Sequence, residues 1–520
     1  MKPVAQVQLA DLRVSTSGRN GRELLCGLSL ELQGGECTGL VGESGSGKSL
    51  TSLALLDLLP SGLKASGRLQ VDGQEIVLGS PAHAALRGRM FGLVPQDPLA
   101  ALHPLRRIGA QLIETLRFAR GLSREAAGKE AEELLRRVQM PDPRQALSKY
   151  PHLFSGGQRQ RIAIALALAT QPRVLIADEP TSALDARIAR DILDLLDDLR
   201  REQNLALLLI SHDLPLVGAY AQRLLVLRGG EVLERGGTAE VFAAPDHAYT
   251  RELLAADQLR ELPAAGDDAP VLLRAEDLRM RYRGAARDAL AGVDVELRRG
   301  EGLALVGESG SGKSTLGRVL LKLLRGAQGR IVLDGVALDS LSASELRKLR
   351  KRIGVVFQDP YASLDPRLDI ARIIGEPLRI HGIGNAASQR AKASELLQAV
   401  GMDDSALDRY PHQFSGGQRQ RIAIARALAT SPDLLVCDEA VSALDAHHRA
   451  AILALLAKLK RERGLALLFV THDLAAASAV AERIAVLEQG RIVESGATAK
   501  VLSNPQHPHT QALVRARPAA

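Results

Sequence analysis

The chain has 520 residues, which is enough for two to four domains of ordinary size. Hydrophobic residues make up 46% and charged residues 24%, and these values exclude a chain that is disordered throughout. Aromatic residues make up only 2%, which argues against binding single-stranded nucleic acid on stacked rings. The net charge of +7 fits either a basic surface for nucleic acid or anionic lipid, or a mildly basic globular protein.

Cysteine usage and hydropathy limit the setting in which the protein works. Cys26, Cys37 and Cys437 show no CxxC spacing, so a metal site or a disulfide is not indicated and a reducing compartment fits. No apolar run approaches the roughly 18 residues that a membrane helix needs. The first 14 residues alternate like a strand and lack the apolar core of a signal peptide. We therefore expect any role at a membrane to depend on a partner.

One segment occurs twice in the chain. FSGGQRQRIAIALALAT begins at Phe154, and FSGGQRQRIAIARALAT begins at Phe414, with Leu166 facing Arg426 as the one difference. GESGSGKS is also found twice. Such self-similarity at long range is typical of a duplicated domain.

The boundary between the copies is indicated by composition. The segment ADQLRELPAAGDDAPV is rich in Ala, Pro, Gly and Asp and has no sustained apolar period, so it is expected to be a linker. The predicted organisation is a first domain over residues 1–255, a linker over 256–271 and a second domain over 272–520.

Both copies show the same order of expected elements. Antiparallel strand signals are followed by a buried strand, a glycine loop, a helix, a helix-rich insert, two apolar strands and a closing hairpin. Apolar runs between helices predict an α/β fold with a parallel sheet covered on both faces. The buried strands are expected at 36–41, 174–177 and 205–210, and at 301–306, 434–437 and 465–470; the inserts are expected at 97–150 and 359–410.

GESGSGKS has the Gly-x4-Gly-Lys-Ser pattern of a phosphate-binding P-loop, between a strand and a helix in both copies. Glycines let backbone N–H groups wrap phosphates, and the helix start adds partial positive charge. Lys48 and Lys313 are expected to reach the β- and γ-phosphates, and Ser49 and Ser314 to bind Mg²⁺. The alternative, a turn rich in Gly and Ser, is disfavoured by the second copy. The candidate ATP-binding residues are Gly42, Glu43, Ser44, Gly45, Ser46, Gly47, Lys48 and Ser49, and Gly307, Glu308, Ser309, Gly310, Ser311, Gly312, Lys313, Ser314 and Thr315.

Two adjacent acids end an apolar strand in each copy. We expect Asp178 and Asp438 to hold Mg²⁺ through water, and Glu179 and Glu439 to polarise the attacking water as general bases. Two solvated carboxylates at a strand end are the alternative. The strand end of a parallel sheet beside a P-loop favours the catalytic role.

The SGGQ segments have the pattern of a helix capping box, with Ser155 and Ser415 as the caps. Paired glycines are poor residues for a first helical turn, so we expect a ligand to approach the bare backbone there. A capped helix start that carries Arg and no acid suits a phosphate. The candidate residues are Ser155, Gly156, Gly157 and Gln158, and Ser415, Gly416, Gly417 and Gln418.

A P-loop, an SGGQ signature and a strand ending in DE, in this order, resemble the nucleotide-binding domain of ATP-binding-cassette (ABC) proteins. The resemblance covers nearly the whole chain twice. It implies an α/β fold of two tandem P-loop NTPase domains, each with a RecA-like core, an antiparallel β subdomain and an α-helical subdomain. It also implies ATP and Mg²⁺ as ligands, and an intramolecular sandwich in which the signature of one half completes the ATP site of the other.

Other positions match the family singly. The resemblance implies a Q-loop glutamine that contacts Mg²⁺ and the lytic water and senses the membrane partner, a D-loop aspartate at the domain interface, and a switch histidine at the γ-phosphate. These positions are Gln96 and Gln358, Asp185 and Asp445, and His212 and His472.

The two halves differ near the P-loop. Tyr282 resembles the aromatic residue that stacks on adenine, whereas the aligned Thr16 cannot stack. Stacking contributes about 1–3 kcal/mol, so we expect the first loop to bind ATP more weakly. That Tyr282 only packs on its sheet is an equal alternative. Leu50 against Thr315 also removes one hydroxyl near the α-phosphate.

The Q-loop sequences QDPLAALHP and QDPYASLDP and the tails APDHAYTRELL and NPQHPHTQALV resemble the oligopeptide, dipeptide and nickel importer branch. This implies an ATPase at the cytoplasmic face of the bacterial inner membrane, with two membrane permease subunits and a periplasmic substrate-binding protein as partners. The helical inserts would offer the docking grooves, although their helices fit plain domain surface as well. No cysteine cluster follows the tails, so no iron–sulfur cluster is expected. The fused form is similar to ATPases of microcin-C-type peptide importers and of glutathione importers. Because so little sequence lies outside the two cassettes, the microcin-C type is favoured.

Two other functions are considered. A soluble tandem cassette acting on ribosomes or DNA would be expected to carry a long charged linker, zinc modules or coiled-coil arms, and the sequence shows none, so no nucleic-acid partner is expected. An exporter motor would differ mainly in its partners.

Overall fold

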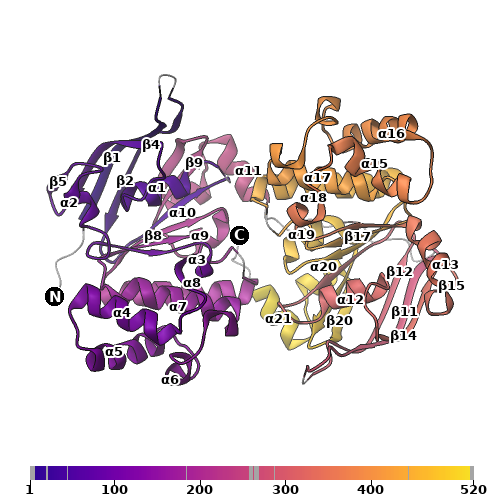
Figure 1. Cartoon of the computed structure of the whole chain (residues 1–520), viewed down its shortest axis with the longest axis horizontal. Coiled ribbons are helices and arrows are strands. Elements are labelled where there is room, and N and C mark those ends of the chain that lie inside the picture. Colours follow the sequence, from indigo (N-terminus) through magenta and orange to yellow (C-terminus); the bar gives the residue numbers. More distant parts are fainter. Residues whose placement is uncertain are drawn as a thin grey trace. The chain divides into compact units, whose positions relative to one another are not determined.

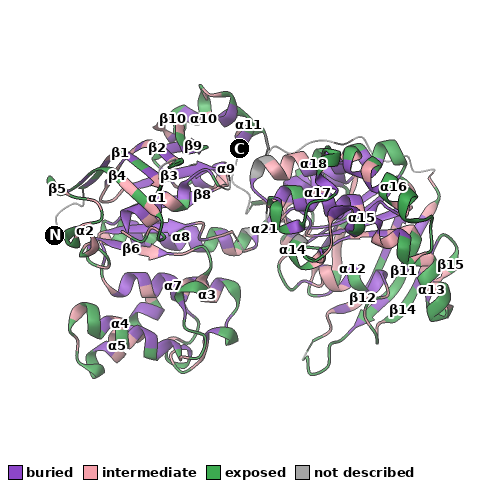
Figure 2. Ribbon diagram, turned by 45° about the horizontal axis from the view of Figure 1, so that its top comes forward, coloured by how far each residue is buried: buried purple, intermediate pink, exposed green. Residues whose placement is uncertain are grey.

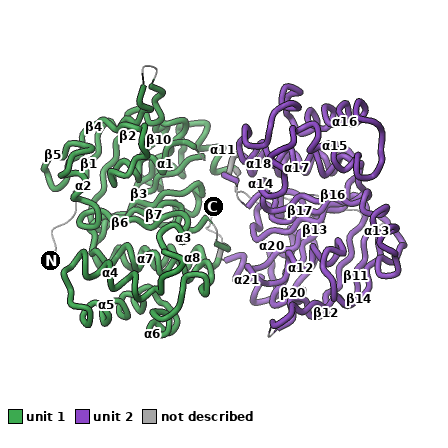
Figure 3. Tube along the Cα trace, viewed as in Figure 1, with its two compact units in different colours: residues 1–255, 518–520 green, residues 256–517 purple. Residues whose placement is uncertain are grey.

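A computed structural model describes residues 6–18, 21–43, 45–182, 184–256, 262, 269–285, 287–442 and 444–515. The chain divides into two compact units, built mainly from residues 1–255 and from residues 256–517 (Figure 3). Most of the expected linker lies outside the described residues. The two units are described separately below.

Each unit holds two sheets and a set of helices whose order repeats (Figure 1). In the first unit the strands are β1 (Gln6–Thr16), β2 (Glu23–Gln33), β3 (Cys37–Gly42), β4 (Leu63–Val71), β5 (Gln74–Ile76), β6 (Phe91–Val94), β7 (Val174–Asp178), β8 (Ala206–Ser211), β9 (Arg223–Arg228) and β10 (Glu231–Gly237). Its helices are α1 (Lys48–Leu55), α2 (Pro81–Ala84), α3 (Pro98–Ala101), α4 (Ile108–Arg120), α5 (Arg124–Arg137), α6 (Pro143–Ala146), α7 (Gly156–Ala169), α8 (Ala186–Gln203), α9 (Leu214–Gly218), α10 (Thr238–Ala243) and α11 (Ala248–Ala256).

The second unit repeats this order. Its strands are β11 (Val271–Met280), β12 (Leu290–Arg298), β13 (Gly302–Val306), β14 (Gln328–Leu333), β15 (Val336–Ala337), β16 (Ile353–Val356), β17 (Leu434–Asp438), β18 (Ala466–Val470), β19 (Arg483–Glu488) and β20 (Arg491–Ala497). Its helices are α12 (Lys313–Leu320), α13 (Ala343–Leu349), α14 (Pro360–Ser363), α15 (Ile370–Ile380), α16 (Ala386–Ala399), α17 (Gly416–Ala427), α18 (Ala446–Arg463), α19 (Leu474–Val480), α20 (Thr498–Ser503) and α21 (Pro508–Arg515).

The larger sheet of each unit is parallel except for a hairpin at one edge. Its strand order is β10-β9-β3-β8-β7-β6 in the first unit and β16-β17-β18-β13-β19-β20 in the second. The smaller antiparallel sheets have the orders β2-β1-β4-β5 and β12-β11-β14-β15. In the first unit the small sheet and the helices α4–α6 lie on opposite sides of the central sheet (Figure 1, Figure 2). This arrangement confirms the predicted parallel sheet, with strand bounds shifted by one residue in places.

Burial explains why these segments form strands. Every residue of β3, β7, β8, β13, β17 and β18 is buried, because helices or the second sheet cover both faces (Figure 2). In β1, by contrast, buried and exposed residues alternate, as expected of a strand with one covered face. The apolar central strands place their polar carboxyl ends, and the residues that follow them, at one edge of the sheet.

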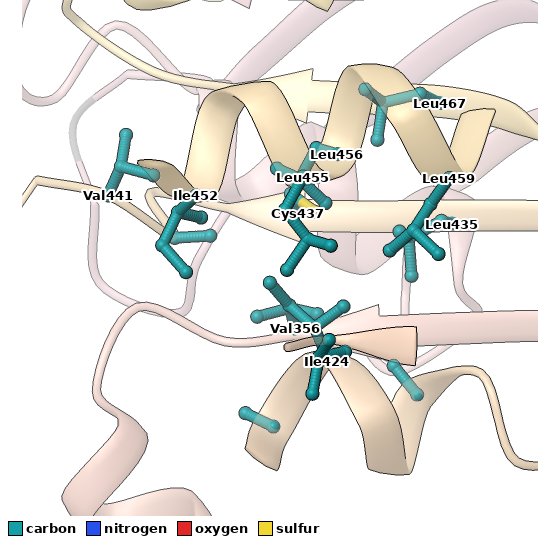
Figure 4. Packing of buried hydrophobic residues seen from close by; sticks show 14 of the residues in the cluster. Val356, Ile424, Leu435, Cys437, Val441, Ile452, Leu455, Leu456, Leu459 and Leu467 are labelled. Carbon is teal, nitrogen blue, oxygen red and sulfur yellow. The ribbon is translucent and has the colours of Figure 1, made fainter. Parts of the chain in front are cut away.

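The core of the second unit shows this packing directly. Leu455, Leu456 and Leu459 of α18 lie against Leu435 and Cys437 of β17, and Ile424 of α17 belongs to the same cluster (Figure 4). Burial raises the pKa of Cys437, and that of Cys37 in β3 to about 12, so both thiols stay protonated and pack as small apolar groups. Among the described residues, no helix is long and apolar enough to span a bilayer.

Candidate nucleotide sites

Each glycine loop joins a buried strand to a helix whose first residue is the predicted phosphate-binding lysine. Gly47 and Gly312 cap α1 and α12 with left-handed φ values of 107° and 108°. A Cβ at Gly47 would lie 2.4 Å from Leu25 Cδ2, and one at Gly312 would lie 2.4 Å from the Ala289 carbonyl oxygen. Only glycine therefore fits at these turns. The first N–H groups of a helix have no partner within it, which makes the turn suitable for phosphate.

The lysines fold back over their loops. Lys48 Nζ donates to the carbonyl oxygens of Gly42 and Glu43 at 2.8 Å each, and Lys313 makes the same two bonds in its own loop. Both side chains are buried. Lys48 Nζ also lies 3.8 Å from Glu179 Oε1, so its charge faces the acidic end of β7.

Two loop hydroxyls fit a bound anion. The Oγ atoms of Ser46 and Ser311 are buried and have no hydrogen-bond partner in the part of the chain that the structure describes. Buried hydroxyls are normally paired, so a phosphate oxygen is a suitable partner for each. Gly45 and Gly310 lie in the exposed turn with φ values of 79° and 82°, whereas Ser44 falls outside the described residues.

The strand-end aspartates face their loops through serine hydroxyls. Ser49 Oγ lies 3.3 Å and Ser52 Oγ 3.0 Å from the Asp178 carboxylate. Burial raises the pKa of Asp178, although these two hydrogen bonds lower it. Burial likewise raises the pKa of Asp438, which Ser314 lowers, and Asp438 Oδ1 is buried without a hydrogen-bond partner among the described residues. Hydroxyl and carboxylate oxygens gathered in this way are the ligands that Mg²⁺ prefers.

The two glutamates predicted as general bases have an unusual backbone. Glu179 and Glu439 adopt left-handed φ values of 46° and 47°, a conformation that costs a residue with a side chain about 1–3 kcal/mol. Their N–H groups donate to the carbonyl oxygens of Ile210 and Val470 at 2.9 Å, which fixes the turn after each strand. The neighbouring strand therefore holds this strained backbone in place.

In the first half, three predicted residues meet at the Glu179 carboxylate. Gln96 Nε2 donates to Glu179 Oε2 at 3.0 Å, and His212 Nδ1 lies 3.4 Å from the same oxygen. Lys48 lies near the other carboxylate oxygen. Four separate segments thus bring one base, one cation and two polar side chains together at Glu179.

The second half repeats the arrangement. Gln358 Nε2 donates to Glu439 Oε2 at 2.9 Å, and His472 Nδ1 lies 3.8 Å from Oε1. The nearby His472 imidazole is the main reason that the pKa of Glu439 lies below its usual value, in spite of the opposing effect of burial. Glu439 is therefore ionised at neutral pH, as a general base must be.

The signature segments form the predicted capping boxes. Gln158 N donates to Ser155 Oγ at 3.4 Å and Ser155 N donates to Gln158 Oε1 at 3.1 Å, and Ser415 and Gln418 do the same in the second half. The described hydrogen bonds of both serines stay within the starts of their own helices.

The glycines of the signature have two different functions. A Cβ at Gly157 would lie 2.6 Å from Ile188 Cγ2, and one at Gly417 would lie 2.5 Å from His448 Cδ2. The second glycine therefore allows α7 and α17 to pack against α8 and α18. Gly156 is exposed, so a ligand could approach the first glycine. The sequence predicts such an approach for both glycines of the pair.

Asp185 and Asp445, the predicted D-loop aspartates, are N-caps. Their Oδ1 atoms accept the backbone N–H of Ile188 and His448 at 3.0 Å. His448 Nδ1 also lies 2.8 Å from Asp445 Oδ1. These bonds fix the start of the helix that packs on the signature glycine, so the D-loop and the signature are held together within each half.

Tyr282 lies beside its P-loop. Its Oη is 3.2 Å from Thr315 Oγ1, and the residue is 41% exposed, so part of the ring is accessible. In the first half, Thr16 Oγ1 accepts the N–H of Arg22 within its own hairpin. The two positions that distinguish the halves in the sequence are thus in contact in the second half.

Comparisons with known proteins agree with this geometry. A family model described as ABC transporter matches residues 25–182 and 290–442, more than half of the chain. The chain belongs to the ABC transporter family. A second model, described as oligopeptide/dipeptide transporter, C-terminal region, matches residues 493–520.

Individual ABC proteins match over most of the chain. The glutathione import ATP-binding proteins GsiA of Escherichia coli (strain K12) and of Salmonella typhimurium are each 42% identical, over 95% of this chain and 86% of their own length. Among solved structures, cbiO1 from Clostridium perfringens, part of the ABC transporter complex cbiONQ, is 29% identical over 45% of this chain and 91% of its own, with a TM-score of 0.42.

Membership of the ABC family confirms the predicted fold class and the predicted ATPase activity. The match of the C-terminal tail and the import relatives favour an importer subunit over an exporter motor or a nucleic-acid-acting protein.

One residue near the first candidate nucleotide site was not predicted from the sequence. Ser52 donates to Asp178 Oδ2, whereas the aligned Gly317 has no side chain with which to reach Asp438. Ser52 lies one helical turn after Lys48, on the same face, and this spacing was the signal that could have revealed it.

Proposed function

We propose that this chain drives uptake of short peptides or peptide-like molecules through two separate membrane permease subunits at the cytoplasmic face of a bacterial inner membrane, with a periplasmic binding protein delivering the substrate. The oligopeptide/dipeptide tail and the relatives named for glutathione import support this substrate class. Glutathione, itself a tripeptide, is the first substrate to test, and a microcin-C-type peptide remains the second.

In the proposed chemistry, Glu179 and Glu439 accept a proton from the attacking water as its oxygen bonds to the γ-phosphorus and the bond to the ADP oxygen breaks. Gln96 orients the Glu179 carboxylate through their hydrogen bond. His212, whose Nδ1 lies 3.4 Å from Glu179 Oε2, would contact the γ-phosphate. Gln358 and the histidine after β18 do the same in the second half.

The residues at the strand ends fit Mg²⁺, because both aspartates are buried beside serine hydroxyls and Asp438 Oδ1 has no hydrogen-bond partner among the described residues. Mg²⁺ bound there would neutralise charge on the β- and γ-phosphates. The residues proposed to hold it are Ser49, Asp178 and Gln96 in the first half and Ser314, Asp438 and Gln358 in the second.

We further propose that the capped starts of α7 and α17 complete the ATP sites of the opposite halves in an intramolecular sandwich. Support comes from the family resemblance and from the first glycine beside each capped helix start, which is exposed at Gly156 and half-buried at Gly416. A capped helix start is a known type of phosphate receptor. Closure with ATP and reopening after hydrolysis would then drive the permeases.

The permease contact is proposed to lie where the Q-loop meets the helical insert. In the second half, a pocket of about 550 Å³ connects these regions. A permease segment seated there would touch Gln358, and through it Glu439. The lining residues on which this argument rests are Gln358, Asp359, Glu376, Pro377, Arg426 and Asp438.

The observation that carries the proposal is the convergence of glutamine and histidine on one glutamate in each half, joined by Lys48 in the first half. The test is uptake of labelled glutathione by a strain that lacks the chain and is complemented with either the wild type or the Glu179→Gln/Glu439→Gln double variant. We expect accumulation with the wild type alone, and co-purification of permeases with both. ATPase activity stimulated by RNA or ribosomes, and not by permease-containing membranes, would refute it.

A further inference from the structure

The tail of the first half is tied to the edge hairpin of the sheet. The Glu234 carboxylate in β10 accepts the backbone N–H groups of Asp246 and His247 at 2.9 and 3.2 Å, and the hydroxyl of Thr250. His247 Nδ1 accepts the N–H of Tyr249 at 3.1 Å. These hydrogen bonds within the tail fix the start of α11.

This anchor places a tyrosine against the P-loop. Tyr249 is 1% exposed, and its Oη accepts the backbone N–H of Glu43 at 3.1 Å, across 206 residues of sequence. The guanidinium of Arg228 lies 4.6 Å from the centre of the tyrosine ring. The phenol is therefore fixed on one side by the hairpin and on the other by the loop that follows β3.

The second half keeps the anchor and changes the contact. Glu494 accepts the N–H groups of Gln506 and His507 at 2.9 and 3.0 Å, as Glu234 does in the first half. The tyrosine position is His509, and the arginine position is Glu488, whose Oε1 lies 3.4 Å from His509 Nδ1. A cation–π pair in one half is thus an imidazole–carboxylate pair in the other.

We propose that Tyr249 is a positioning residue for the first phosphate-binding loop. By accepting the N–H of Glu43, it holds the entry of the loop in the curve that lets the following N–H groups surround a phosphate. The oligopeptide-type tail thus contributes to nucleotide binding. His509 cannot supply a phenol oxygen, so this contact differs between the two ATP sites. The inference rests on the nucleotide sites proposed above.

The experiment measures nucleotide affinity of the first loop alone. The full chain carries Lys313→Ala, which disables the second loop, and binding of a fluorescent ATP analogue is titrated. Tyr249→Phe removes only the hydroxyl and keeps the ring beside Arg228. Tyr220→Phe is the matched control, because Tyr220 Oη bonds Asp194 Oδ1 at 2.7 Å, away from the loop.

We expect Tyr249→Phe to raise the Kd about fivefold, as loss of one neutral hydrogen bond predicts, and Tyr220→Phe to leave it unchanged. In the chain with both loops intact, the KM for ATP should rise with kcat unchanged. Hydrogen exchange of the peptide that contains Glu43 should become faster in Tyr249→Phe only, which separates loop positioning from a general loss of stability.

Equal Kd values for the two tyrosine variants, or unchanged exchange at Glu43, would overturn the inference. Lys48→Ala, made in the same Lys313→Ala chain, distinguishes a failure of the Tyr249 inference from a failure of the nucleotide-site assignment. If Lys48→Ala abolishes binding, the site stands and only the role of Tyr249 fails; if binding survives Lys48→Ala, the site assignment fails.

Discussion

The exposed ring of Tyr282 allows a direct test of whether the two ATP sites differ in affinity. We predict that Tyr282→Thr, which introduces the residue found in the first half, weakens ATP binding at the second loop. Since the Oη is 3.2 Å from Thr315 Oγ1 and the residue is 41% exposed, the side chain is near the loop and partly open to solvent, as a residue that stacks on adenine must be.

The magnitude follows from the stacking energy. Loss of one base–aromatic stack costs about 1–3 kcal/mol, which corresponds to a rise in Kd of about 5- to 150-fold. Loss of the hydroxyl contact alone would cost about 0.5 kcal/mol, the low end for a neutral hydrogen bond, because the group is exposed to water. Tyr282→Phe, which keeps the ring, therefore separates the two contributions.

The assay is titration of a fluorescent ATP analogue against the full chain carrying Lys48→Ala, so that binding reports on the second loop. We expect Tyr282→Phe to bind within about threefold of the parent and Tyr282→Thr to bind at least fivefold more weakly. If both variants bound like the parent, the ring would only pack on its sheet, and the predicted difference between the halves would lose its main support.

Three further predictions concern the chemistry, the packing and the coupling. Glu179→Gln with Glu439→Gln should lower ATP turnover at least a thousandfold, measured by phosphate release, yet leave ATP bound; near-normal hydrolysis would remove both bases. Gly417→Ala should lower the free energy of unfolding by about 1–3 kcal/mol in denaturant titrations, because its Cβ would lie 2.5 Å from the imidazole of α18, whereas Gly416→Ala, with 3.9 Å to its nearest neighbour, should not. Arg426→Leu, which copies the first half, should remove the hydrogen bond to the Ser363 carbonyl oxygen beside the Q-loop and lower permease-stimulated ATPase activity more than basal activity; equal losses would contradict a role in coupling.

The fold was predictable because the sequence patterns that indicate it are short and occur in both halves. The runs that became β7 and β17 are apolar up to a final aspartate and are bounded by helix signals, so they could be only buried strands or buried helix segments. Their length of 5 residues decides for strands. The P-loop pattern then located the strand before it and the helix after it. Where the observed strand bounds differ from the predicted ones, as in β8, backbone pairing with the neighbouring strand determines where the strand ends.

The site was predictable in its members and not in its contacts. The sequence indicated Gln96, Glu179 and His212 separately, and the structure brings them together. The left-handed backbone of Glu179 and the bond from Tyr249 to Glu43 could not be predicted, because each depends on the packing of segments that are far apart in sequence. Periodicity specifies which face of an element is buried, but it does not specify which distant side chain lies against it.

The differences between the halves follow a pattern that bears on function. The lysine, glutamine, both acids and the switch histidine are the same in both, and the distances around Glu179 and Glu439 are similar. The substitutions fall instead on groups that hold the loop or face the nucleotide base: Thr16 against Tyr282, Leu50 against Thr315, Ser52 against Gly317 and Tyr249 against His509. Groups of this kind change ground-state binding more than the transition state for phosphoryl transfer. We therefore expect the two halves to differ in how tightly they hold ATP and to share the same hydrolytic chemistry.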